Sequence, residues 1–217
     1  MNEYLQATPY FNYKDQKVVD YFDSLPICSN VSAIENAIAI YYAVRDDFAY
    51  DTTGAFDGAP TLTAEFCFNQ HQGYCLPKSA LMIALCRKVG IPARIGLADV
   101  KNHLANPKLL EQLKTDVFSM HGYVDLFLAG KWVKATPAFD KNLCARHNIS
   151  PLEFDGLADS IFHEFTGEGD KHMEYLVDHG TFAEMPVKFI QQNFAKHYPH
   201  LAHCFQNDVL STSTTGD

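Results

Sequence analysis

Apolar residues recur at helical spacing after Ser32 and predict a helix that ends near Asp46. Ser32 is a candidate N-cap, and Glu35 has the spacing of a capping box. A second apolar run begins at Cys75 and has apolar residues on nearly every side, which indicates a buried, central helix. Gly90 is a natural residue to follow its end.

Alternating apolar and polar positions predict the strands. Residues 91–98 form a strand that returns over the central helix, and residues 121–127 and 132–136 form an antiparallel hairpin. Further helices are expected, and they span residues 14–24, 63–66, 107–113, 170–179 and 187–197, with a capped helix start at 150–153. The polar residues 207–217 are expected to fray.

These elements favour an α+β fold in a single domain over residues 1–217. We expect its core over about residues 31–142 and a helical C-terminal extension over residues 143–217. A chain of this length is sufficient for one domain with a hydrophobic core.

The composition argues against several classes of function. With 217 residues, 47% apolar residues and a net charge of −9, the chain is typical of a soluble globular protein and does not fit a nucleic-acid partner. The first residues lack the features of a signal peptide, and no apolar run is long enough to cross a membrane, so we expect a cytoplasmic protein. Its six cysteines are then expected to be reduced thiols.

We expect no metal site. The cysteines form no C-x-x-C pair, which leaves a zinc ribbon or a thioredoxin motif without support. The run His197-Tyr198-Pro199-His200-Leu201-Ala202-His203-Cys204 contains metal-ligand residue types, but Pro199 interrupts the helix that would align them.

Cys75 is the candidate nucleophile. It stands where the central helix begins, and the free N–H groups and dipole of a helix start favour a thiolate over a thiol. His121, at the start of the hairpin, is the candidate base that deprotonates the cysteine and later protonates the leaving group.

Hairpin geometry nominates a third group. If Ala129 and Gly130 are the central turn residues, His121 lies opposite Ala138, and Thr136 and Asp140 are its diagonal neighbours. Asp140 would stabilise an imidazolium by charge, whereas Thr136 would only orient the ring, and the sequence leaves both open.

The backbone N–H of Cys75 is expected to receive the developing oxyanion. Gln70 or Gln72, just upstream, would add a side-chain donor, and Tyr74 is a candidate substrate contact. Lys78 is expected to be a surface lysine and Arg94 to make a structural ion pair.

The motif set resembles the transglutaminase-like superfamily, and in particular its small bacterial domain proteins. The resemblance covers about residues 35–140 and rests on Gly73-Tyr74-Cys75, Lys78-Ser79-Ala80-Leu81, Gly90-Ile91-Pro92-Ala93-Arg94, His121-Gly122-Tyr123 and Gly130-Lys131-Trp132-Val133. It implies a papain-like fold, with the cysteine helix packed on an antiparallel sheet, and a Cys-His-Asp triad without an organic cofactor. Cys75 and His121 match the family's motif, but Thr136 occupies the position of the family's aspartate, four residues after Trp132.

Two functions follow as hypotheses. The first is a cysteine enzyme that catalyses acyl transfer or amide hydrolysis on a peptide, a protein, or a small amide or thioester. The second is a weakly active or inactive binding module that holds a peptide or small ligand in the same cleft, and Thr136 is the feature that favours it.

Overall fold

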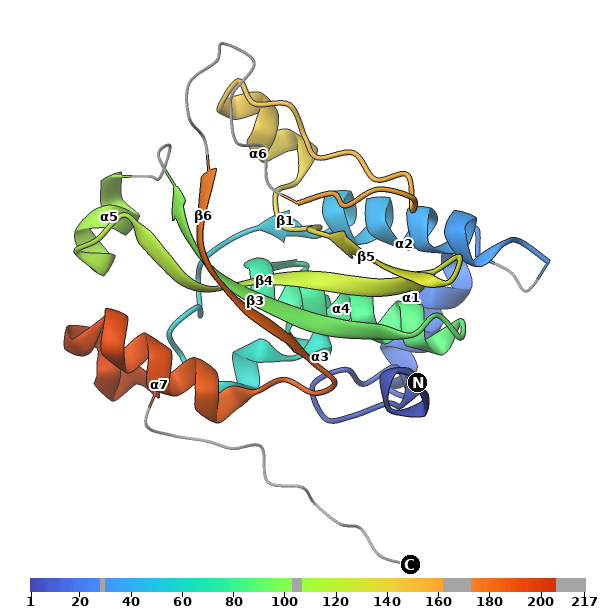
Figure 1. Cartoon of the computed structure of the whole chain (residues 1–217), viewed down its shortest axis with the longest axis horizontal. Helices are drawn as coiled ribbons and strands as arrows, with labels where there is room; N and C mark the ends of the chain where they lie inside the picture. Colours follow the sequence, from blue (N-terminus) through green and yellow to red (C-terminus); the bar gives the residue numbers. More distant parts are fainter. Residues whose placement is uncertain (28–29, 103–106, 162–172, 206–217) are drawn as a thin grey trace, which may run out of the picture.

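A curled antiparallel sheet packs against a buried helix in the computed structural model, which describes residues 1–27, 30–102, 107–161 and 173–205 (Figure 1). The strand order within this sheet is β5-β4-β3-β6. The strands are β1 (Ala49–Tyr50), β2 (Gln72–Gly73), β3 (Ala93–Asn102), β4 (Val117–Leu128), β5 (Lys131–Ala135) and β6 (Met173–Phe182). The chain therefore has the predicted α+β fold of the papain-like type.

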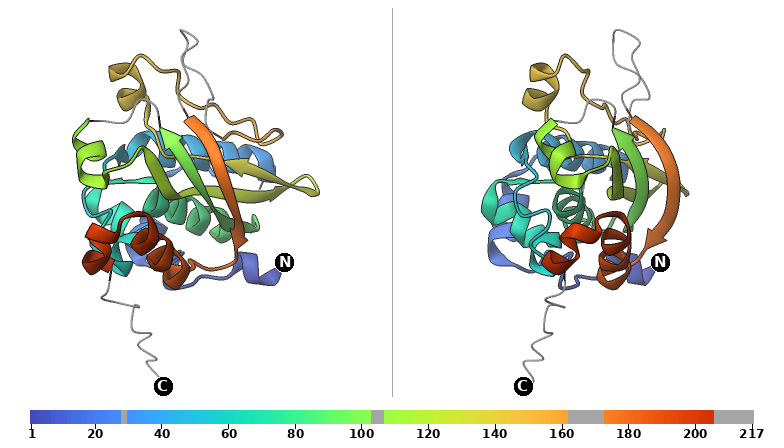
Figure 2. Two further views of the ribbon diagram at one scale, coloured as in Figure 1. Left: turned by 60° about the vertical axis from the view of Figure 1, so that its left-hand side comes forward. Right: turned by 90° about the vertical axis from the view of Figure 1, so that its left-hand side faces the viewer.

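The helices α2, α3 and α4 lie on one side of the sheet (Figure 2). The α-helices are α1 (Gln16–Ser24), α2 (Ala33–Asp47), α3 (Ala64–Gln70), α4 (Cys75–Lys88), α5 (Pro107–Leu113), α6 (Lys141–Arg146) and α7 (Val187–His197). Short 3₁₀ helices are η1 (Asn2–Leu5), η2 (Ala59–Leu62) and η3 (Pro199–Phe205). Within the described ranges, none of the helices combines the length and the apolarity needed to cross a bilayer.

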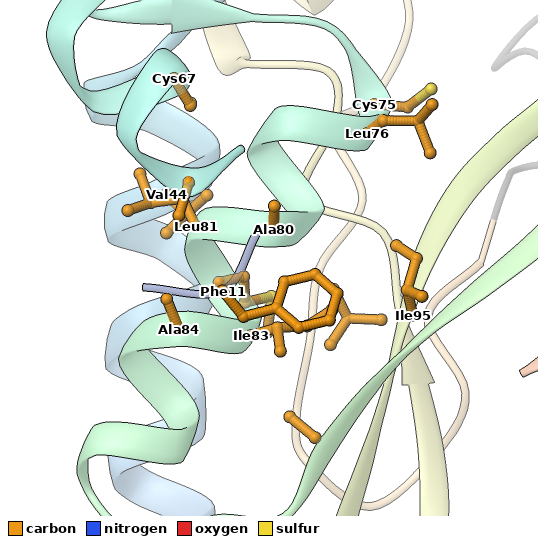
Figure 3. Close-up of a cluster of buried hydrophobic side chains, with 14 of the residues drawn as sticks. Phe11, Val44, Cys67, Cys75, Leu76, Ala80, Leu81, Ile83, Ala84 and Ile95 are labelled. Carbon is orange, nitrogen blue, oxygen red and sulfur yellow. The ribbon is translucent and has the colours of Figure 1, made fainter. Parts of the chain in front are cut away.

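Helix α4 is the centre of the hydrophobic core, as its apolar pattern predicts. Every residue from Cys75 to Arg87 is buried, and Leu76, Leu81 and Ile83 contribute to the cluster that joins α4 to the sheet and to α2 (Figure 3). The expected capping box of α2 is also present, with Ser32 and Glu35 each accepting a backbone N–H of the other. The structure therefore confirms the predicted helices α2 and α4.

Lys78 is fully buried, so the expectation of a surface lysine is wrong. Its Nζ donates to the carbonyl oxygens of Arg45 at 2.9 Å and Phe48 at 2.6 Å, at the C-terminal end of α2. Carbonyl groups at a helix end lack partners within the helix, and they attract a cation. Burial lowers the pKa of Lys78 to about 8.

The short strands β1 and β2 connect the end of α2 to the residues before Cys75. They pair in parallel, with Ala49 opposite Gln72 and Tyr50 opposite Gly73. This pairing places Tyr50 beside the start of α4.

The β4–β5 hairpin has the predicted register. Leu128 pairs with Lys131 and Val124 with Ala135, and the turn residues Ala129 and Gly130 have φ of 48° and 83°. Positive φ at both positions is typical of a type I′ turn, whose twist matches the hairpin.

The C-terminal region differs from the prediction. Residues 173–179, expected in a helix, belong to β6, which pairs with β3 and extends the sheet, so residues 143–217 are not a purely helical extension. Residues 150–153 form no helix, whereas α6 starts earlier, with Asp140 as its N-cap. Helix α7 has the predicted bounds. The tail at 207–217 lies outside the described residues.

Candidate active site

Cys75 lies at the first position of α4, and its side chain points away from α2 (Figure 3). Strand β4 crosses this helix start at Gly122. A Cβ atom at position 122 would lie 2.8 Å from Leu76 Cδ2 and 3.5 Å from the carbonyl carbon of Cys75. A side chain here would force Leu76 to move, and the close approach brings the neighbouring His121 to the end of α4 that carries Cys75.

Cys75 and His121 line the same small cavity, which has a volume of about 60 Å³. Cys75 is 8% exposed and His121 is 4% exposed. Much of the remaining wall is aromatic and comprises Tyr50, Phe56, Tyr74, Phe118, Phe194 and Tyr198. The structure therefore combines a buried thiol and a buried imidazole in a mostly apolar site.

Burial determines the charge state of this pair. It raises the pKa of the Cys75 thiol to about 11, although the backbone N–H groups of Gly122, Leu76 and Cys75 itself oppose this rise. Burial also lowers the pKa of His121 to about 3. The sequence predicted a thiolate, but the loss of water outweighs the helix start, so thiol and imidazole are both neutral near pH 7 in the enclosed site.

A larger cavity of about 660 Å³ adjoins the first one. His121 belongs to the walls of both cavities, and the two also share Tyr50, Thr52, Leu109 and Phe118. Other walls of the larger cavity come from α5, the start of α6 and the loop that follows α6. The imidazole thus lies between a narrow chamber beside the sulfur and a wide one.

The two candidates for the third group have different surroundings. Thr136 follows β5 and is 1% exposed, and its hydroxyl has no hydrogen-bond partner among the residues that the structure describes. Asp140 accepts the Tyr50 N–H at 2.8 Å and caps α6 by accepting the Leu143 N–H at 2.9 Å. Burial alone would raise the pKa of Asp140, but these two bonds and the Lys78 charge hold it below its usual range.

Asp140 therefore links Tyr50, a cavity residue, to the start of α6. Of the predicted oxyanion and substrate contacts, only Tyr74 lines the cavity beside Cys75. Its hydroxyl lies 3.4 Å from Thr61 Oγ1. Gln70 is exposed at the end of α3, and Gln72 is half-buried in β2.

The sequence analysis missed several cavity residues. Tyr50 belongs to the short strand β1, and Phe194 and Tyr198 come from the distant C-terminal region. No local sequence pattern predicts that these residues lie beside Cys75, because α7 contacts β4 only in the folded chain. Arg94, by contrast, makes the expected structural pair, with its Nη2 2.7 Å from Asp125 Oδ2.

The described part of the chain contains no group of three or more His, Cys, Asp or Glu side chains suited to hold a metal. Cys67, Cys75, Cys86, Cys144 and Cys204 are free thiols.

A cysteine at the start of a buried helix, next to a histidine on an antiparallel strand, defines a papain-like cysteine-enzyme fold. The sequence model of the transglutaminase-like superfamily matches residues 27–137. This match covers half of the chain, and the protein belongs to that superfamily.

Two solved structures are similar in fold. Arylamine N-acetyltransferase from Salmonella typhimurium aligns with 93% of this chain and 74% of its own length, with 11% identity and a TM-score of 0.50. A proposed cysteine protease from Cytophaga hutchinsonii aligns with 82% of this chain, with 16% identity and a TM-score of 0.45. The match covers 53% of that protease, about half its length. A search of curated proteins gave no match.

Proposed function

We propose that this protein is a cysteine enzyme that transfers or hydrolyses a short acyl group, with Cys75 as nucleophile and His121 as general base. The observation that supports it best is that both side chains line one enclosed cavity at the start of α4. A buried cysteine in a purely structural setting has no need of an imidazole in the same chamber.

In the resting site both groups are neutral, so the proton leaves the thiol only as the sulfur attacks. His121 accepts the proton of the Cys75 thiol while the sulfur attacks the substrate carbonyl, which forms a C–S bond and an oxyanion. Backbone N–H groups at the start of α4 stabilise that oxyanion. The C–N or C–S bond of the substrate then breaks, and the imidazolium gives its proton to the departing amine or thiol.

A second step releases the enzyme. Water or an amine attacks the thioester on Cys75 while His121 removes its proton, and the tetrahedral intermediate expels the Cys75 thiolate. The imidazolium returns the proton to this sulfur. Whether the product is an acid or a new amide depends on which nucleophile reaches the wide cavity.

Cavity sizes support a short acyl group. An apolar cavity of roughly 150 Å³ is large enough for benzene, whereas the chamber beside Cys75 measures about 60 Å³. It suits an acyl group of a few atoms without charge. The wide cavity of about 660 Å³ has room for the bulkier part of a small amide, thioester or peptide substrate.

The test is to trap the acyl-enzyme. The protein is mixed with p-nitrophenyl acetate or p-nitrophenyl hexanoate, and the acylated residue is identified by peptide mass spectrometry. We expect an acetyl group on Cys75, formed faster than the hexanoyl adduct. His121→Gln should slow acetylation by about 10²-fold or more, because it removes the general base.

Cys75→Ser and Cys204→Ser serve as matched controls. The first should abolish rapid acetylation, and the second, which removes a half-exposed thiol, should leave it unchanged. Equal acetylation of Cys75 in the native protein and in His121→Gln would contradict the proposal.

The second hypothesis, a binding module, draws on Thr136 and Asp140. Thr136 replaces the acidic residue of the family pattern, and both carboxylate oxygens of Asp140 accept backbone N–H groups. If it is correct, short acyl amides will raise the midpoint of thermal unfolding while Cys75 stays unmodified by either ester.

A further inference from the structure

Strand β4 contains a bulge immediately before His121. Ala98 of β3 pairs with His121 and Val100 pairs with Phe118, so Ser119 and Met120 lie opposite the single residue Asp99. Met120 has a φ of 59°, in the left-handed region that few side chains adopt. Such bulges redirect the residues that follow them.

Side chains accept both N–H groups of the bulged residues. Asp99 Oδ1 accepts the N–H of Met120 at 3.0 Å. Tyr198 Oη accepts the N–H of Ser119 at 2.7 Å and donates to the carbonyl oxygen of Val117 at 2.9 Å. A buried N–H without an acceptor is costly, so these two side chains stabilise the irregular backbone.

The C-terminal region also supports the Asp99 carboxylate. Its Oδ2 lies 3.1 Å from Nε2 of His179, on β6, and 3.5 Å from Nε2 of His197, at the end of α7. Asp99 is 4% exposed. Two imidazoles beside a buried carboxylate reduce the cost of its burial, and they fasten β6 and α7 to the bulge.

Tyr198, His179 and His197 all lie beyond residues 27–137, the part that matches the superfamily. Tyr198 and Phe194 also form part of the wall beside Cys75. The C-terminal region therefore contacts both the cavity and the backbone that presents His121.

We propose that Asp99 and Tyr198 are positioning residues for His121, which they hold at Cys75 by fixing the bulge at Ser119 and Met120. This inference rests on the proposed role of His121 as general base. It assigns to the C-terminal region a direct part in the acyl-transfer site.

Two readouts test it. The first is the rate of Cys75 acetylation by p-nitrophenyl acetate. The second is the titration of the His121 imidazole by NMR, assigned by its loss in His121→Gln. Tyr198→Phe removes one hydroxyl and keeps the ring, and we expect acetylation to fall about tenfold, as for one lost buried hydrogen bond. We expect the His121 titration midpoint to rise toward about 6.5 as the relaxed bulge admits water.

A conservative substitution at Asp99 should preserve the acetylation rate that a deletion of its side chain lowers. Asp99→Ala removes the acceptor of the Met120 N–H and should reproduce both changes, whereas Asp99→Asn retains a carbonyl oxygen and should restore most of the acetylation rate. Tyr13→Phe is the control, because it deletes a hydroxyl that donates to Leu5 O at 3.0 Å in the N-terminal segment. It should change neither readout.

The inference is overturned if Tyr198→Phe and Asp99→Ala lower only the unfolding midpoint and leave acetylation and the His121 titration unchanged. It is also overturned if Asp99→Asn is as impaired as Asp99→Ala, since the contacts between the carboxylate and the two histidines would then matter and not the bond to Met120. If the native protein forms no acetyl-Cys75, the proposed function fails, and the His121 titration still decides whether the bulge is held by these residues.

Discussion

The two ends of β4 are held in different ways. At the hairpin end, Leu128 pairs regularly with Lys131 across a two-residue turn, so neighbours in sequence determine the structure. At the His121 end, a bulge depends on Asp99 from β3 and Tyr198 from beyond α7. Local sequence thus determines the hairpin end of β4, whereas the His121 end depends on residues that are distant in sequence.

Of the variants described here, a larger side chain at Gly122 should change the difference between the two ends of β4 most. In Gly122→Val, the new side chain meets Leu76 at the start of α4 and pushes β4 away, which should cost about 1–3 kcal/mol of stability. A displacement of about 1 Å between His121 and Cys75 should slow acetylation about 10²-fold. Urea unfolding and the ester assay measure the two effects.

Gly130→Ala is the matched control at the other end. With a φ of 83° and no atom within 4 Å of the added methyl group, it should cost about 1 kcal/mol of strain and leave acetylation unchanged. Similar loss of activity in both glycine variants would show that the ends of β4 are not independent.

Acid should destabilise the protein through His121. Burial lowers its pKa to about 3 in the folded state, against about 6.5 when unfolded, so between these values only the unfolded state binds the proton. Stability therefore falls as pH falls, by about 2 kcal/mol from this residue at pH 5. Urea unfolding at pH 7 and pH 5 should show a smaller loss in His121→Gln than in the native protein.

For this prediction Cys75→Ser is the control, because it should keep the acid sensitivity of the native protein. An undiminished loss of stability in His121→Gln would mean that His121 does not titrate as a buried group.

At the hairpin end, Arg94→Lys should have the smallest effect. The Arg94 Nε and Nη2 atoms donate to Asp125 Oδ2 at 2.9 and 2.7 Å, and its guanidinium lies 3.8 Å from the centre of the Trp132 ring. Lysine reproduces neither the fork nor the stacking, so we expect a loss of about 1 kcal/mol and an unchanged acetylation rate. Slower acetylation would reveal coupling between the two ends.

The sequence predicted the parts of the fold that local patterns encode. The capping box of Ser32 and Glu35, the apolar run of α4 and the turn at Ala129 and Gly130 each specify their element through close neighbours. The hairpin pairing does not reach His121, however, because it ends at Val124 and Ala135, and His121 pairs with Ala98 of β3 instead of lying opposite Ala138. Gly122 is also part of the sequence motif, but the reason for a glycine there is seen only in the structure, where β4 passes close to Leu76.

Tertiary contacts account for the failures. Lys78 is a residue type that is seldom buried, and only the carbonyl groups at the end of α2 explain its place. Residues 173–179 read as a helix, but pairing with β3 makes them a strand. Asp140 is the N-cap of α6, a position that aspartate favours, and this role competes with a place beside the imidazole.

The bulge before His121 has no local signature. Ser119 and Met120 are unremarkable in sequence, and their acceptors lie 79 and 21 residues away, respectively. The candidate nucleophile and base could thus be named from the sequence, whereas the residues that support the bulge could not.

The enclosure of Cys75 also bears on how the protein tolerates oxidants. Peroxides attack thiolates that they can reach, and the sulfur of Cys75 is both protonated and shielded by aromatic rings. Cys204 is half-exposed and should form sulfenic acid first. The same walls that would limit the size of an acyl group should thereby protect the Cys75 thiol from oxidation.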